Sequence, residues 1–379
     1  MKTKATIKGL VLKVASRCNL NCEYCYMYNL GDETYKSQPK FMSEVIVDYV
    51  LNNVRTYLTK SGSKTFTFIF HGGEPLLVGY YFYQNFVRKV KELLPAHIKI
   101  DYVIQTNGVL LSDEWCMVLG NLDIRIGISL DGTTEESNRY RLDHSGKSSL
   151  SATLKAIVRA KESKYLKYLP GLLSVIDIKT NPEVLYETYK FLKIKHLNFL
   201  LPDGTYDNLP KSYDPTKIHY SDWLIRLFDK WFNDCEANKP QITFFNQILH
   251  RILGGDSELE YFGGVKDINL IIETNGDIEP QDSLKACGEN FTKTYFNIAS
   301  HSLIDSLNQP LINYCLESQY ILSEQCKNCS VVEICRGGYI THRFSKERGF
   351  NNPSIYCRDL EKLILHISER VEKMLEKFR

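Results

Sequence analysis

The 379-residue sequence lacks a long hydrophobic segment. No stretch reaches the roughly 18 apolar residues that are needed to span a bilayer. A secretory signal needs a basic start followed by about 7–15 uninterrupted apolar residues, and four lysines interrupt this region: Lys2, Lys4, Lys8 and Lys13. We therefore expect a cytoplasmic protein, in a compartment where disulfides are rare and clustered cysteines are more often metal ligands or redox groups.

A strong charge of either sign is also missing. The 47 Lys and Arg residues nearly balance the 45 Asp and Glu residues, for a net charge of +2, so no overall field favours nucleic acid or an anionic membrane as partner. The proportions of hydrophobic (43%) and charged (24%) residues exclude a disordered, collagenous or coiled-coil protein. At about 100–200 residues per domain, the length indicates two domains.

The middle of the chain has few cysteines. Of the eleven, three lie near the N-terminus and six lie between Cys287 and Cys357, with only Cys116 and Cys235 between these groups. Cys116 follows Trp115 in a helical segment, and Cys235 continues the apolar stripe of another predicted helix. We expect both in the core, where free cysteines are usually found.

Short runs of apolar and β-branched residues alternate with segments of helical periodicity. The predicted strands are Gly9–Ala15, Thr65–Phe70, Ile98–Ile104, Ile124–Leu130, Leu172–Ile176 and Leu197–Leu201. The predicted helices include Ser43–Leu58, Tyr81–Leu94, Ser148–Lys161 and Ser221–Cys235. This alternation predicts an α/β fold with a parallel sheet. Six units in about 200 residues suit a partial (β/α)6 TIM-like barrel, with its site at the carboxyl ends of the strands.

The alternation ends at a glycine-rich stretch, which suggests the domain organisation. We expect the barrel over residues 1–240, a bridging segment over 241–264, and a cysteine-rich domain over 265–358. A C-terminal amphipathic helix over 359–379 would pack back on the body through Leu360, Leu363, Ile367, Val371 and Leu375.

The first cysteine group directly follows the first predicted strand, as Cys18-x3-Cys22-x2-Cys25. Three thiolates on one loop can hold an iron–sulfur cluster. A [4Fe–4S] cluster would keep one iron without a protein ligand, and an open metal position is typical of a catalytic site. A three-ligand zinc site and a coincidence of spacing are the alternatives.

This motif, followed by an aromatic residue at the end of a first barrel strand, resembles the radical S-adenosylmethionine (SAM) superfamily. The resemblance implies that SAM binds the open iron, that an electron from the cluster cleaves its sulfonium, and that the 5′-deoxyadenosyl radical takes a hydrogen from the substrate. Other segments at strand ends also match, including a Gly-Gly-Glu motif whose carboxylate suits the SAM ammonium. By resemblance, the SAM-binding residues are Tyr24, Gly72, Gly73, Glu74, Gln105, Asn107, Ser129, Asp131 and Arg141.

The second group is Cys326-x2-Cys329-x5-Cys335, with Cys357 further on. Four cysteines can hold a structural zinc ion or an iron–sulfur cluster. The spacing resembles the SPASM extension of many peptide-modifying radical SAM enzymes, which implies an auxiliary [4Fe–4S] cluster on these four residues.

The chain departs from the full SPASM pattern. Tyr339 and Gln281 stand where that family has further cysteines, so we expect one auxiliary cluster and two [4Fe–4S] clusters in all. Cys287 is either a spare ligand or a buried thiol, and Cys315 is expected in the core.

Two local stretches narrow the resemblance: Cys25–Asn29 with Pro39–Ser43, and Cys335–Cys357. Both are similar to the SPASM maturases that form cyclophanes in ribosomal precursor peptides. The resemblance implies abstraction of a β-hydrogen, addition of the carbon radical to an aromatic ring, and electron transfer to the auxiliary cluster. Asp282 is the candidate general base, because related enzymes carry a catalytic Asp next to this hairpin position. A hydrogen-bonded turn carboxylate is the alternative for Asp282.

Other chemistry of the same family is the alternative function: formylglycine formation, thioether formation, or alcohol dehydrogenation. A zinc-stabilised binding module is the non-enzyme alternative. The partners implied are a precursor peptide and an external electron donor such as flavodoxin or ferredoxin. The first strand begins near residue 9, so we expect leader recognition by the barrel surface, the SPASM surface or a separate protein.

Overall fold

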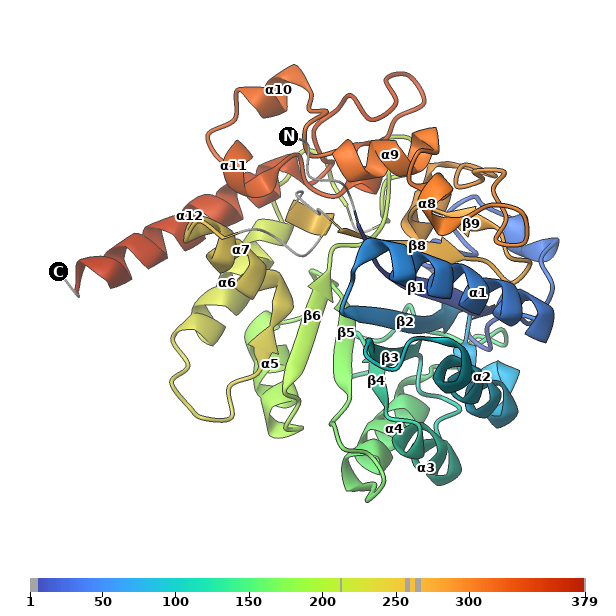
Figure 1. Cartoon of the computed structure of the whole chain (residues 1–379). Helices are drawn as coiled ribbons and strands as arrows, with labels where there is room; N and C mark the ends of the chain where they lie inside the picture. Colours follow the sequence, from blue (N-terminus) through green and yellow to red (C-terminus); the bar gives the residue numbers. More distant parts are fainter. Residues whose placement is uncertain (1–5, 212, 256–259, 263–266, 378–379) are drawn as a thin grey trace. The chain divides into compact units, whose positions relative to one another are not determined.

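The computed structural model describes residues 6–211, 213–255, 260–262 and 267–377. The chain forms two compact units, each assembled from three segments (Figure 1). The first unit comprises Met1–Ser129, Tyr140–Pro170 and Lys266–Leu316. The second unit comprises Leu130–Arg139, Gly171–Val265 and Glu317–Arg379.

The first unit contains a mixed sheet in the order β4-β3-β2-β1-β8-β9. Its strands are β1 (Thr6–Ala15), β2 (Thr65–Gly72), β3 (Lys99–Thr106), β4 (Ile124–Ser129), β8 (Asp267–Ile272) and β9 (Ile278–Glu279). Neighbouring strands from β4 to β8 are parallel, whereas β9 runs antiparallel to β8. The four strands predicted in this part of the chain are confirmed, and β8 adds a parallel neighbour of β1 that the sequence pattern did not single out.

The helices of the first unit are α1 (Glu44–Ser61), α2 (Tyr80–Leu93), α3 (Asp113–Asn121), α4 (Leu150–Glu162), α8 (Leu303–Ser306) and α9 (Pro310–Glu317). Residues at the boundaries explain where a helix begins and ends. Ser43 caps α1 by accepting a hydrogen bond from the Ile46 amide, and Gly62 ends it in the left-handed conformation, with φ of 70°. In the core, Phe68 and Phe70 of β2 are fully buried and pack edge-on against Phe86 of α2.

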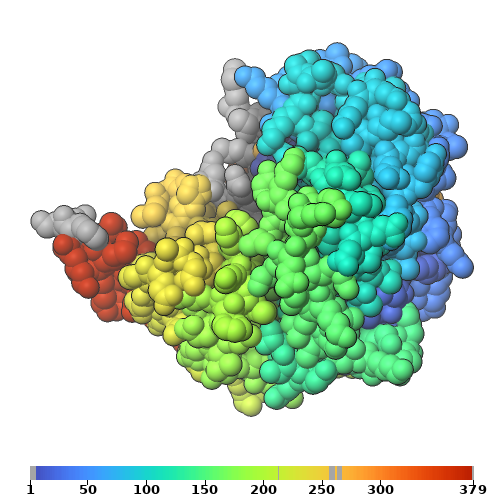
Figure 2. Space-filling view, turned by 90° about the horizontal axis from the view of Figure 1, so that it is seen from below, coloured from blue at the N-terminus to red at the C-terminus, as the bar shows by residue number. Residues whose placement is uncertain are grey.

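The second unit contains three parallel strands: β5 (Gly171–Val175), β6 (His196–Leu200) and β7 (Gln241–Ile242). Its helices are α5 (Pro182–Phe191), α6 (Tyr220–Phe232), α7 (Thr243–Ile252), α10 (Glu324–Lys327), α11 (Val332–Cys335) and α12 (Cys357–Glu376). As predicted, α12 packs on the body of the unit, against α6 and α7. Figure 2 shows its end (red) beside these two helices (yellow). Leu375, the last residue of the predicted stripe, is 43% exposed.

The predicted bridging segment 241–264 contains β7 and α7, and its residues 256–259, 263 and 264 lie outside the described part of the chain. No helix among the described residues has the length and apolar character that a membrane span requires.

Of the three cysteines expected in the core, one is buried and two are not. Cys116 is fully buried, as predicted. Cys235 is exposed, so its assignment to the core is wrong. The reason is that α6 ends at Phe232 and is capped at Asn233, so that Cys235 no longer follows the helical stripe. Cys315 is only partly buried and therefore does not belong to the core either.

Candidate active site

The loop after β1 brings Cys18, Cys22 and Cys25 together in the first unit. The Cys25 amide donates to the Cys22 carbonyl at 3.0 Å, which folds the end of the loop into a turn. The Leu20 amide donates to the Cys18 sulfur at 3.3 Å, and Asn107 Nδ2 lies 3.7 Å from the same sulfur. Hydrogen bonds to cysteine sulfur stabilise the thiolate form that an iron ligand needs.

These thiols lie in an environment that disfavours a free thiolate. Burial raises the pKa of Cys18 and Cys25 to about 12. A bound cation reverses this preference, because a coordinating thiol is deprotonated by the metal. Hydrogen-bond donors aimed at sulfur, in a site that water does not solvate well, therefore fit an iron–sulfur cluster.

The two glycines of the Gly-Gly-Glu motif let the end of β2 approach the cysteine loop. A Cβ on Gly73 would overlap Tyr28 Oη and the Arg17 carbonyl oxygen. Gly72 has a φ of 133°, and a Cβ there would overlap the Ala15 carbonyl oxygen. These glycines thus allow the end of β2 to approach the chain's own backbone closely.

Glu74 is fully buried behind the loop. Its carboxylate accepts from the Leu76 amide at 3.0 Å, from Thr106 Oγ1 at 2.7 Å and from the Asn107 amide at 2.9 Å. Burial raises the pKa of Glu74 in spite of these donors. Glu74 therefore joins the carboxyl ends of β2 and β3 through these hydrogen bonds. The sequence assigned Glu74 a role toward SAM and did not predict this structural role.

The other residues predicted to bind SAM fall into two sets. In the first unit, Arg141 Nη1 donates to Tyr24 Oη at 2.8 Å, and Gln105 Nε2 donates to Ser129 Oγ at 2.9 Å. Asp131 belongs to the second unit, where its carboxylate accepts from the Val175 amide at 2.9 Å. Gln105 and Ser129 lie at the carboxyl ends of the parallel strands β3 and β4, and the partner of Asp131 is the last residue of β5.

Asp282 lies in a charged group at the start of a 3₁₀ helix, Asp282–Cys287. Its carboxylate forms an ion pair with the fully buried Lys13 of β1 and accepts from Tyr26 Oη at 2.7 Å. Lys13 Nζ also lies 3.2 Å from His71 Nδ1. Although burial opposes ionisation, the charge of Lys13 and the hydrogen bonds from Lys13 and Tyr26 hold the pKa of Asp282 well below its usual range. Burial lowers the pKa of His71 to about 3, so its ring is neutral.

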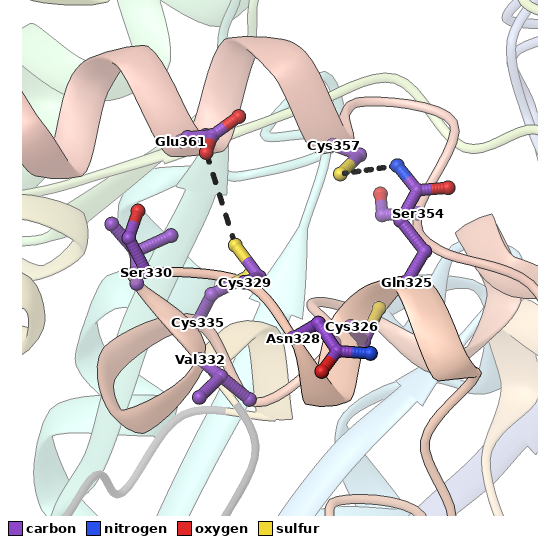
Figure 3. Close-up of a pocket in the computed structure, with 12 residues that line it drawn as sticks. Gln325, Cys326, Asn328, Cys329, Ser330, Val332, Cys335, Ser354, Cys357 and Glu361 are labelled. Atoms are coloured by element: carbon purple, nitrogen blue, oxygen red, sulfur yellow. Dashed lines mark hydrogen bonds between the residues drawn. The ribbon is translucent and has the colours of Figure 1, made fainter.

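The four C-terminal cysteines line a cavity of about 340 Å³ within the second unit (Figure 3). Three of them come from the segment around α10 and α11, and Cys357 is the first residue of α12. Ser323 caps α10 by accepting from the Cys326 amide at 3.3 Å. Three consecutive residues with positive φ (Arg336, Gly337 and Gly338) turn the chain sharply after Cys335. These local structures aim the four side chains into one cavity.

The donor set of this cavity, four cysteines, fits a [4Fe–4S] cluster, in which each iron binds one thiolate. Burial, and then the neighbouring cysteines, raise the pKa of Cys335 to about 12 and of Cys357 to about 11. A bound metal reverses this preference, because it deprotonates a coordinating thiol.

Comparison with known proteins supports this arrangement. Residues 12–192 match the Radical SAM superfamily. The chain has a radical SAM fold. It is similar to a cysteine-type anaerobic sulfatase-maturating enzyme of Clostridium novyi (strain NT), with 28% identity over 94% of each chain. It is also similar to a serine-type anaerobic sulfatase-maturating enzyme of Bacteroides thetaiotaomicron, with 25% identity over 96% of this chain and 90% of the relative.

Among solved structures, one described as native anSMEcpe with bound AdoMet and Cp18Cys peptide superposes with a TM-score of 0.82. The two sequences are 25% identical, and the match covers 97% of this chain and 99% of that one. The match extends through the C-terminal region, so the radical SAM fold with a C-terminal auxiliary domain, predicted from the sequence, is confirmed.

The structure also shows what stands at the positions where this chain lacks the SPASM cysteines. Tyr339 is largely buried and stacks on Tyr261, with ring centroids 4.4 Å apart and planes inclined by 5°. Gln281 is 7% exposed, and Cys287 is equally buried at the end of the 3₁₀ helix. A packed aromatic ring thus stands at one position where the SPASM pattern has a cysteine.

Lys13, Tyr26 and His71 are functional candidates that the sequence analysis missed. Lys13 interrupts an otherwise apolar strand, between Leu12 and Val14, which are both fully buried. A lysine in such a strand is rarely buried unless it is paired. A lysine within this apolar strand could therefore have indicated that Lys13 has a buried carboxylate partner.

Proposed function

We propose that the chain is a radical SAM enzyme that oxidises the β-carbon of a cysteine in a peptide or protein substrate to formylglycine. The observation that carries this proposal is the similarity to a cysteine-type anaerobic sulfatase-maturating enzyme over 94% of both chains. The match includes the auxiliary region as well as the barrel, and this coverage supports the proposal.

In this proposal Cys18, Cys22 and Cys25 hold the cluster that binds SAM. When bound, SAM and this cluster supply the 5′-deoxyadenosyl radical, which removes a hydrogen atom from the substrate. The Arg141–Tyr24 pair offers a cation for the SAM carboxylate, since a guanidinium suits a planar carboxylate. Asn107, which contacts Cys18, links the cluster loop to the end of β3.

Asp282 serves as the proton acceptor. Conversion of a cysteine to a thioaldehyde removes one hydrogen atom from Cβ, then one electron and the thiol proton, and water replaces sulfur afterwards. Lys13 and Tyr26 hold the Asp282 carboxylate ionised and in position, so that an acceptor is available at any pH near neutrality. Cys326, Cys329, Cys335 and Cys357 would hold the auxiliary cluster, which would supply an acceptor for the electron.

Two alternatives differ from this proposal, one in the residue that is oxidised and one in the product. Serine-type relatives match with slightly lower identity than the cysteine-type relative, 25% against 28%. Cyclophane formation has the support of two short stretches of sequence, and the relatives that match over most of the chain are maturases of sulfatases instead. Formylglycine formation, first considered as an alternative, is therefore the function that we favour.

The test is an anaerobic assay of the reconstituted protein with SAM, a one-electron reductant and a short sulfatase-type peptide carrying a single cysteine. We expect 5′-deoxyadenosine and a peptide aldehyde that a hydrazine reagent traps, located at the former cysteine by tandem mass spectrometry. Matched peptides with Ser or Ala at that position measure the side-chain preference and the background. A crosslinked product, or 5′-deoxyadenosine formation that no cysteine peptide stimulates, would contradict the proposal.

A further inference from the structure

A carboxylate faces the thiols of the auxiliary cavity. Glu361 Oε1 lies 3.9 Å from the sulfur of Cys329, and the two side chains point toward one another (Figure 3). Glu361 follows Cys357 by four residues in α12, and residues at this spacing lie on the same face of a helix. The helix that supplies one cluster ligand therefore also supplies a carboxylate to the same cavity.

In the part of the chain that the structure describes, no lysine or arginine forms an ion pair with Glu361, and the neighbouring Lys362 pairs with Asp222 instead. The Cys329 S–H group donates to Glu361 Oε1. In the proposed cluster Cys329 would bind iron as a thiolate, so that Glu361 would lie directly beside a ligand sulfur.

An amide donor lies at another edge of the same cavity. Gln325 Nε2 lies 4.0 Å from the sulfur of Cys357, at a weak hydrogen-bonding distance (Figure 3). Gln325 is exposed, as are Asn328 and Ser330, which also line the cavity. The auxiliary cluster would thus lie near the surface of the unit, with a carboxylate on one ligand and an amide donor on another.

These two groups act on reduction in opposite directions. Reduction adds one negative charge to the cluster, so a nearby carboxylate disfavours the reduced state and a hydrogen bond to a ligand sulfur favours it. We propose that Glu361 lowers the reduction potential of the auxiliary cluster and that Gln325 raises it. The inference rests on the auxiliary cluster of the proposed function, but not on the identity of the substrate.

The consequence for the reaction concerns the electron that the substrate radical gives up. A cluster held here would take up this electron and would release it to an external carrier before the next turnover. A lowered potential makes the second transfer more favourable, because the reduced cluster releases its electron more readily. Glu361 is in this sense a tuning residue for the cluster and does not touch the substrate.

The experiment is a redox titration, followed by electron paramagnetic resonance, of the full chain in a Cys18→Ala/Cys22→Ala/Cys25→Ala background. This background leaves the auxiliary cluster as the reporter, without SAM or peptide. Relative to this parent, Glu361→Gln should shift the midpoint potential to a more positive value, and Glu361→Lys should shift it further. Gln325→Leu should shift the potential to a more negative value.

Glu333→Gln is the matched control, because Glu333 lies in α11 with Cys335 but is exposed and paired with Arg336. The midpoint potential of the Glu333→Gln variant should equal that of the parent. Circular dichroism and iron analysis establish that each variant is folded and loaded. A Glu361→Gln potential equal to that of the parent, or loss of iron from this variant, would overturn the inference. A parent that binds no iron would overturn the auxiliary-cluster assignment itself, which is a distinguishable result.

Discussion

The Lys13 ammonium of β1 forms an ion pair with the Asp282 carboxylate, 269 residues further along the chain. Lys13 is fully buried, and it also contacts His71 at the end of β2. The pair therefore ties the strand that leads into the cysteine loop to the segment that follows the β8–β9 hairpin. It also fixes the charge of the residue that we propose as proton acceptor.

We expect Lys13→Met to impair peptide oxidation and to make the rate of oxidation decrease as the pH is lowered. The folded pKa of Asp282 is depressed, so in the wild type the carboxylate loses its charge only at pH values below the unfolded pKa of about 3.9. Without the ammonium, burial raises the pKa of Asp282, and product formation should fall as the pH is lowered from neutrality. The pH profile of aldehyde formation measures this change.

Lys8→Met is the matched control for Lys13→Met, because Lys8 lies on the same strand, is largely exposed and pairs with Asp267. A pH profile of Lys13→Met that matches that of Lys8→Met would show that the buried ion pair does not set the charge of Asp282.

Asp282→Asn should separate radical formation from product formation. The amide cannot accept the substrate proton, so aldehyde formation should fall by at least about 100-fold, the usual contribution of a positioned base. Production of 5′-deoxyadenosine should persist, because none of the three cysteines of the SAM cluster is changed. Equal losses of both products in Asp282→Asn would assign the residue a structural role.

Cys22→Ala should abolish 5′-deoxyadenosine formation and remove one cluster, about half of the bound iron. Cys235→Ala is the control for the loss of a thiol, since Cys235 is exposed beyond the end of α6. Its iron content and activity should equal those of the wild type. Retained 5′-deoxyadenosine formation in Cys22→Ala would refute the assignment of the first cysteine group.

The sequence was informative where function depends on local spacing. The Cys18–Cys25 motif, the Gly-Gly-Glu motif and the C-terminal cysteines each follow a short pattern, and a strand or helix end positions each of them. The partial barrel was predictable for the same reason, since its strands alternate with amphipathic helices.

Long-range pairing was not predictable. The Lys13–Asp282 pair and the parallel contact of β8 with β1 join segments that are more than 250 residues apart, and no local periodicity encodes such a contact. The exposure of Cys235 was missed because hydrophobic periodicity does not locate the end of a helix. Glu74 was assigned to SAM by resemblance, and its three protein donors come partly from β3, which lies about 30 residues further on.

Gly73→Ala should disturb the cysteine loop. The added methyl would overlap Tyr28 Oη and the Arg17 carbonyl group, and the latter is backbone that cannot rotate away. Overpacking of this kind costs about 1–3 kcal/mol, so we expect a lower melting temperature and reduced iron content. Gly171→Ala is the control, because a Cβ there meets its nearest atom at 3.7 Å. Full iron loading of Gly73→Ala would show that the loop adapts to a side chain.

A buried charge cluster predicts how stability depends on pH. Lys285 lies between Glu273, Glu279 and Asp32, all of them almost completely buried. Burial, and then the charge of Glu273, raise the pKa of Glu279 to about 7. The folded state therefore binds a proton that the unfolded state releases above about pH 4.3. Stability should decrease as the pH rises from there to about 7, and then level off.

Glu279→Gln keeps the hydrogen-bonding shape of the protonated acid without its charge. The stability of this variant should not decrease between about pH 4.3 and pH 7. It should unfold at a higher temperature than the wild type at pH 8, and the two melting temperatures should differ little near pH 5. Thermal unfolding at the two pH values measures the difference. Glu289→Gln is the control, since Glu289 is an exposed carboxylate that follows the same hairpin. A Glu279→Gln variant that is less stable than the wild type at pH 8 would show that the ionised Glu279 holds Lys285 in place.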